Sequence, residues 1–206
     1  MNITSIDIFG IEGFAHCKSC FYTTQSVLSG LPLGSDYHFN TGINKLTGDI
    51  DSGIWAVSYF LSMYGCRPKD FIFFEDPKVM VNKTVMPMRE LSRYTCYIDE
   101  LYPLFSTKAS VRKLVVKGLK KSGIDQTVDS IKELFQLDDG RFERRVSQNG
   151  NERYRAMAAI GCAYDKKVFC LPWMSQERFE YLRGTMGILL KALDSLGKIV
   201  ILPVGK

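Results

Sequence analysis

The first part of the chain has the residue pattern of a strand-rich region. Residues 2–9 alternate between apolar and polar side chains and are rich in β-branched residues, and a second strand is expected over 16–24. A loop rich in Gly, Pro and Ser at 29–35 precedes a short strand at 36–40. The run 43–47 is again β-prone and leads into a glycine. We therefore expect an N-terminal antiparallel β part.

Helical spacing is found later in the chain. Over 110–121 and 126–135, apolar residues recur every three or four positions with lysines outside them. A helix of small apolar residues is expected over 149–163, and one long helix over 176–196. The stretch that starts at Ile54 is apolar on all sides, which is typical of a buried helix.

Uninterrupted apolar runs indicate a parallel sheet. KVFCL at 167–171 and IVIL at 199–202 lack the alternation of half-exposed strands. Such runs are typical of parallel strands that are covered on both faces. Further strands are expected at 76–84 and 93–98. The predicted fold class is α/β.

Composition narrows the classes of protein. The chain has 206 residues, of which 46% are hydrophobic and 24% charged, so it can bury a core and is not expected to be disordered. The formal net charge is +5, with Lys and Arg scattered along the sequence, and no nucleic-acid partner is predicted. The N-terminus lacks a basic-then-apolar leader, and no apolar run reaches the roughly 18 residues of a membrane span. These features predict a cytosolic protein.

The six cysteines do not predict a metal site. Cys96, Cys162 and Cys170 lie in apolar runs, where cysteine behaves as a small core residue. Cys17 and Cys20 form a CxxC, but no second pair completes a zinc set.

Residues 48–55, GDIDSGIW, have the setting of a phosphate-binding loop. They follow a β-prone run and precede an apolar helix. Gly48 and Gly53 stand at the spacing of the outer glycines in G-x-x-x-x-G-K-[ST], and Ser52 is small. This setting alone fits any strand-turn-helix as well as a nucleotide site.

The charges that phosphate chemistry needs are missing from this loop. Ile54 stands at the lysine position and Trp55 at the hydroxyl that binds magnesium, while Asp51 adds a carboxylate. Because each charge-assisted hydrogen bond is worth about 1.5–3 kcal/mol, we expect no useful phosphate affinity.

The order of these segments resembles the ATP-binding subunit of ABC transporters. Members run P-loop, helix, glutamine loop, helical subdomain, a signature of the form LSGGERQR, a strand with catalytic acids, and a last strand near a histidine. The likeness covers most of the chain. It implies one domain over 1–206 with a P-loop NTPase-like core sheet, helices on both of its faces and a helical subdomain at about 105–160.

The signature counterpart is QNGNERYR at 148–155. About 100 residues separate it from the loop at 48–55, which fits the family order. It keeps the glycine, glutamate and arginines of the family pattern as Gly150, Glu152, Arg153 and Arg155. Asn149 replaces the signature serine and Asn151 the second glycine.

The other counterparts also depart from the family. Pro172 stands where the magnesium-binding Asp is expected, Trp173 where the catalytic Glu is expected, and Gly205 near the histidine position. We therefore predict that Ile54, Trp55 and Trp173 help to fill an empty phosphate and magnesium space. The glutamine-loop counterpart implies residues that dock a membrane permease, and the candidates are Glu100, Tyr102 and Phe105.

The resemblance implies a degenerate, catalytically silent subunit of a membrane transporter complex. Its implied partners are a transmembrane permease and a second ABC ATPase-type subunit, either a second copy or an intact paralogue. No cofactor of its own is expected, with ATP and Mg only at a partner's site. The implied location is cytoplasmic and peripheral to the membrane. Two alternatives are a soluble regulatory module that reuses the fold and a nucleotide enzyme of unusual chemistry.

Overall fold

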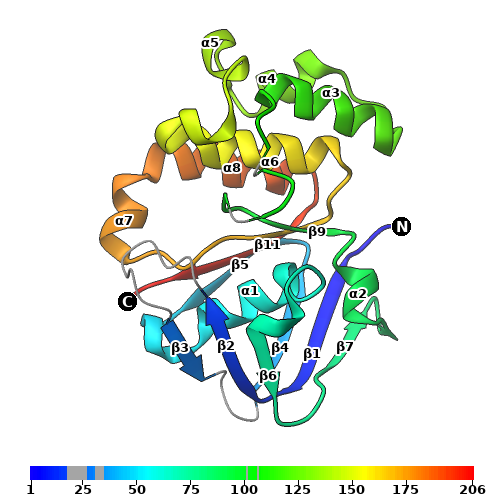
Figure 1. Ribbon diagram of the computed structural model, residues 1–206, viewed down its shortest axis with the longest axis vertical. Helices are drawn as coiled ribbons and strands as arrows, with labels where there is room; N and C mark the ends of the chain where they lie inside the picture. The colour runs from blue at the N-terminus through cyan, green and yellow to red at the C-terminus, as the bar shows by residue number, and fades with distance from the viewer. Residues whose placement is uncertain (18–26, 31–34, 101, 106) are drawn as a thin grey trace.

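A computed structural model describes residues 1–17, 27–30, 35–100, 102–105 and 107–206. Three sheets and the helices that pack between and over them make up this part of the chain (Figure 1). The N-terminal antiparallel part that the sequence predicts is confirmed and forms two of these sheets.

The larger antiparallel sheet has the strand order β4-β1-β7-β8. Its strands are β4 (Ser35–Asn40), β1 (Ser5–Ile11), β7 (Lys78–Val81) and β8 (Thr84–Val85). The smaller one has the order β3-β2-β6. Its strands are β3 (Val27–Gly30), β2 (Gly13–Cys17) and β6 (Phe71–Phe73).

Two details of this region differ from the sequence prediction. β3 occupies the start of the segment expected to be a loop, because it pairs antiparallel with β2. β6 was not predicted, since a run of three residues is too short for a periodic signal. The remainder of the strand expected over 16–24, from 18 onward, lies outside the described residues, as does Cys20.

The third sheet is parallel, with the strand order β5-β11-β10-β9. Its strands are β5 (Gly42–Thr47), β11 (Ile199–Val204), β10 (Val168–Cys170) and β9 (Thr95–Tyr97). Every residue of β9, β10 and β11 is buried, which confirms the reading of the uninterrupted apolar runs.

Helix α1 (Ile54–Met63) lies between the parallel sheet and the antiparallel strands, and all of its residues are buried (Figure 1). Its two serines satisfy their hydroxyl groups internally. The Ser58 hydroxyl donates to the Leu171 carbonyl at 2.6 Å, and the Ser62 hydroxyl donates to the Ser58 carbonyl at 2.8 Å. Rings then join the helix to β6, with Phe60 and Phe73 5.2 Å apart between centroids.

Helices α6 (Arg153–Ala163) and α8 (Arg183–Ser195) cover the other face of the parallel sheet (Figure 1). Gly161 allows close contact there, because a Cβ at this position would lie 2.7 Å from the Phe169 ring. α8 is preceded by α7 (Gln176–Tyr181), so the single helix expected over 176–196 is wrong. The helical path breaks at Leu182, a buried residue between the two helices.

The remaining helices gather at the end of the molecule opposite the antiparallel sheets (Figure 1). They are α3 (Val111–Ser122), α4 (Val128–Leu134) and α5 (Asp139–Phe142), whereas the short α2 (Met88–Leu91) follows β8. They fall inside the range expected for a helical subdomain, and the division of the chain there stays a prediction. No helix among the described residues has the length and apolar character to cross a bilayer.

Candidate functional site

The loop at 48–53 connects β5 to α1 at the carboxyl end of the parallel sheet. The Gly48 N–H donates to the Val204 carbonyl at 3.1 Å, so the loop starts against the end of β11. A short 3₁₀ turn, η1 (Ile50–Ser52), follows, and Gly53 then adopts φ 79° to begin the helix. A side chain at this position would be strained, which explains the glycine.

Two side chains of the loop and of the start of α1 lie close to Gly48. A Cβ on Gly48 would lie 2.5 Å from Ser52 Oγ and 3.5 Å from Ile54 Cδ1. The Ser52 N–H and hydroxyl both bond to the Asp49 carbonyl, at 3.0 and 2.5 Å. A phosphate-binding loop instead points successive N–H groups at the anion. Ser52 therefore bonds the loop to itself, and the loss of phosphate binding here stays a prediction.

Trp173, which lies shortly after β10, contacts the same loop. Its indole Nε1 donates to the Gly48 carbonyl at 3.0 Å, and Pro172 before it is buried. The end of β11 meets the same ring, because a Cβ on Gly205 would lie 3.1 Å from Trp173 Cζ2. Gly48, Trp173 and Gly205 thus lie together at the carboxyl end of the parallel sheet.

Trp55 is directed into the core. It is 2% exposed, and its ring lies 6.2 Å from that of Tyr59. Its Nε1 is buried without a hydrogen-bond partner among the described residues. Ile54 and Trp173 thus lie next to Gly48, whereas Trp55 does not. That these three residues fill an empty phosphate and magnesium space stays a prediction.

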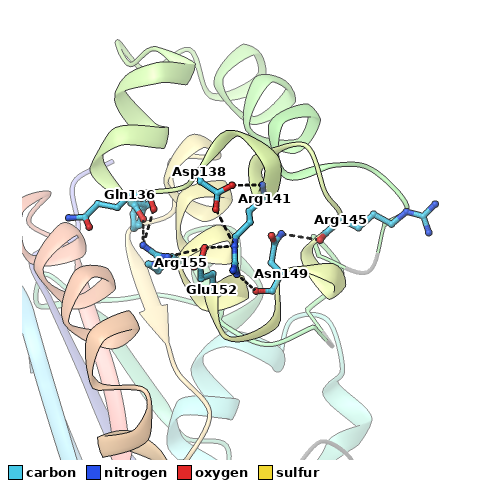
Figure 2. Close-up of polar contacts among 8 residues, drawn as sticks. Gln136, Asp138, Arg141, Arg145, Asn149, Glu152 and Arg155 are labelled. Atoms are coloured by element: carbon cyan, nitrogen blue, oxygen red, sulfur yellow. Dashed lines mark hydrogen bonds and ion pairs between the residues drawn. The ribbon is translucent and has the colours of Figure 1, made fainter.

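The signature counterpart is held by a network of charged side chains around the buried Arg155 (Figure 2). Arg155 is 7% exposed and donates to the carbonyls of Phe135 and Gln136, at 3.3 and 2.9 Å. Glu152 Oε2 lies 3.0 Å from Arg155 Nη2 and 3.2 Å from Arg141 Nε. These contacts fix the start of α6 against α4 and the turn that follows it, so Glu152 and Arg155 have structural roles.

Arg141 was not singled out from the sequence. It binds the Asp138 carboxylate at 3.1 Å as well as Glu152, and Nη1 donates to the Asn149 carbonyl at 3.4 Å. The sequence signal for Arg141 is its Asp-x-x-Arg spacing from Asp138, which is the N-cap of α5.

Asn149 is turned inward. It is 2% exposed, and its Nδ2 donates to the Arg145 carbonyl at 3.0 Å. The side chain therefore does not stand where the signature serine would face a partner. The exposed part of the turn is Gly150, with φ 52° and open space at its Cβ position, and Asn151. Asn151 Oδ1 accepts from Arg178 Nη2 at 3.3 Å.

The proposed docking loop needs a correction. Tyr102 and Phe105 are 5% and 3% exposed, with their rings 5.5 Å apart, so they are core residues and not exposed anchors. The Tyr102 hydroxyl donates to the Thr95 carbonyl at 2.9 Å, and burial raises its pKa. Glu100 is half-exposed and binds Arg153 at 3.0 Å, which connects this loop to the signature counterpart.

Comparison with known proteins supports the fold. No protein-family model and no curated protein matches the chain. A putative ABC transporter ATP-binding protein from Pyrococcus furiosus aligns with a TM-score of 0.64 and 10% identity, over 98% of this chain and 92% of that one. The cbiO1 protein of Clostridium perfringens, part of the ABC transporter complex cbiONQ, aligns with a TM-score of 0.65 and 10% identity, over 100% and 80%.

A bacterial Atm1-family ABC exporter with ATP bound also aligns, with a TM-score of 0.61 and 9% identity. This chain is covered completely and spans 35% of the exporter. These matches confirm the fold expected from the resemblance. At such low identity they say nothing by themselves about activity.

Proposed function

We propose that this chain, which has the fold of ABC transporter ATP-binding subunits, is a catalytically silent subunit of a membrane transport complex. In this proposal it does not bind or hydrolyse ATP. It pairs with a second ABC ATPase-type subunit, docks a transmembrane permease, or does both. It is cytoplasmic, and these partners hold it beside the membrane.

The observation that carries the proposal is the hydrogen bond from Trp173 Nε1 to the Gly48 carbonyl. It joins two segments that would have to stand apart to admit a triphosphate, and Ser52 and Ile54 pack over Gly48. Phosphoryl transfer requires a metal, a positioned water and groups that stabilise negative charge. The residues that the resemblance assigns to the family's functional positions offer none of these groups in their side chains: Ile54, Trp55, Pro172, Trp173 and Gly205.

The pairing role is supported by the signature turn. Gly150 and Asn151 are exposed, and the charge network of Arg141, Glu152 and Arg155 holds the turn in place. A rigid, solvent-facing turn at the start of a helix is suited to a partner's phosphate groups. The cbiO1 neighbour is part of a transporter complex, which agrees with a subunit role for this fold.

Co-purification tests the proposal directly. A tagged chain expressed in its native host and purified through the tag is expected to co-purify with an ABC ATPase that has an intact P-loop lysine, with a membrane permease, or with both. Recovery of only a stable monomer or homodimer would contradict the proposal and favour a soluble regulatory module.

A charge variant tests which face makes the pairing. Asn151→Glu places a carboxylate at the exposed turn, where it would repel a partner's nucleotide, and is expected to reduce ATPase recovery at least tenfold. Gly184→Glu adds the same charge on α8, where the Cβ position is open, and is the matched control. Equal recovery with both variants would rule out the signature turn as the pairing surface.

A further inference from the structure

Helix α3 has one side in the core and one side in solvent. Val111, Leu114, Val115 and Gly118 are buried, and Gly118 packs directly against Tyr164. The opposite side carries a basic face, which we define by its residues Arg112, Lys113, Val116, Lys117 and Lys120. Figure 1 places α3 at the outer end of the molecule. The scatter of basic residues along the sequence thus becomes a cluster on this helix.

Most of the charges on the basic face do not stabilise α3 itself. The first turn of α3 has no acidic residue and carries Arg112 and Lys113, which face the positive end of the helix dipole. Lys113 and Lys117 are four residues apart, and Lys117 and Lys120 are three apart, so like charges repel along the face. A positive charge in the last turn of a helix stabilises it through the helix dipole, but among the residues of the basic face only Lys120 lies there.

The face is also poorly neutralised by acidic neighbours. Glu143 is the one carboxylate among the residues of this shallow groove, and it binds Arg112 at 3.0 Å. Lys113, Lys117 and Lys120 form no ion pair with any described carboxylate. Asp139 also attracts Arg112, but its carboxylate forms an ion pair with Lys132.

Two arginines from another segment extend the positive charge. The Arg144 carbonyl accepts from the Val111 N–H at 2.8 Å, which brings residues 144 and 145 next to the first turn of α3. Both arginines are exposed, and Figure 2 shows the Arg145 side chain extending away from the protein. The excess of positive charge therefore spans two elements.

We propose that the basic face of α3 docks on an anionic phospholipid surface. Lysines act as point charges that suit mobile head groups, and Val116, 45% exposed among them, can contact the interfacial region. The face carries no aromatic side chain for base stacking, which disfavours single-stranded nucleic acid. The choice of a membrane rests on the proposed function, which places the chain beside a bilayer.

Vesicle co-sedimentation tests this assignment. The chain is expected to bind vesicles of phosphatidylcholine with 30% phosphatidylglycerol at low salt, to bind pure phosphatidylcholine weakly, and to dissociate as salt rises. A basic residue near an anionic surface changes the binding constant about fivefold, so K113Q/K117Q/K120Q is expected to weaken binding on the order of 100-fold. Glu143→Gln, which frees Arg112, is expected to strengthen it several-fold.

The matched control replaces three exposed lysines elsewhere, on β5, the turn before β6, and β7. This K45Q/K69Q/K78Q variant is expected to keep most of the binding. Equal weakening by both triple variants, or no binding to anionic vesicles, would overturn the proposal. Lysine-dependent retention by a permease in pure phosphatidylcholine would also overturn it, since the face would then serve a protein. If the chain binds both anionic vesicles and ATP, the catalytically silent role is refuted and the docking of the basic face on lipid is not.

Discussion

The hydrogen bond between Trp173 and Gly48 can be removed by a single substitution. Trp173→Phe keeps an aromatic side chain but deletes the indole N–H that donates to the buried Gly48 at 3.0 Å, together with the outer ring that lies near Gly205. A buried acceptor that loses its donor costs about 1–3 kcal/mol. We expect the free energy of unfolding to fall by about 2 kcal/mol.

Urea unfolding followed by far-UV circular dichroism measures this change. With a slope of about 2 kcal/mol per molar urea, the midpoint should fall by about 1 M. Tyr181→Phe removes a hydroxyl from a side chain that is 70% exposed and should change stability by less than about 0.5 kcal/mol. If Trp173→Phe is as stable as that control, the indole does not close the corner and the reasoning is wrong.

Three other predictions concern buried groups. Arg155→Met should lower the free energy of unfolding by about 3 kcal/mol, because the buried arginine binds two carbonyls and the partly buried Glu152 carboxylate. Exposed Arg145→Met should be nearly neutral in the same urea assay. Exposed Cys66 should react with a thiol reagent in the native state, as seen by peptide mass spectrometry, while Cys162 and Cys170, whose pKa values burial raises to about 12, should react only on unfolding. In the unfolded chain these thiols ionise with a pKa near 9.0. Above that pH the unfolded state therefore binds fewer protons than the folded state. The free energy of unfolding should fall between about pH 9 and 12. Native labelling of Cys162, or a flat stability profile over that range, would contradict their burial.

The parallel sheet could be predicted because burial leaves a direct mark on composition. The runs at 167–171 and 199–202 are apolar on both strand faces, and the structure pairs these two strands in parallel. The all-apolar stretch from Ile54 likewise becomes a helix enclosed by sheets. The break at Leu182 was missed because α7 and α8 are both helical and only the packing of one buried leucine separates them.

The site was only partly predictable, since its contacts join residues far apart in sequence. That 48–55 and 172–173 lie together followed from the resemblance, but the indole bond to Gly48 depends on one rotamer. Tyr102 and Phe105 were assigned to a surface by analogy, although large aromatic residues in an apolar segment are more often core. The sequence predicts lysines on the outer side of α3, but it does not show that few carboxylates neutralise them, because that depends on which segments lie beside the helix in the fold.

The most direct test of the central claim is a thermal-shift titration of the purified chain with Mg-ATP. A ligand at 100 times its dissociation constant stabilises the native state by about 2.7 kcal/mol, which raises the melting temperature by several degrees. With the loop closed by Ser52, Ile54 and Trp173, we expect a flat melting temperature up to millimolar Mg-ATP, while an active ABC ATPase in the same assay shifts. A saturable rise for this chain would show that the corner opens to nucleotide and would contradict the account.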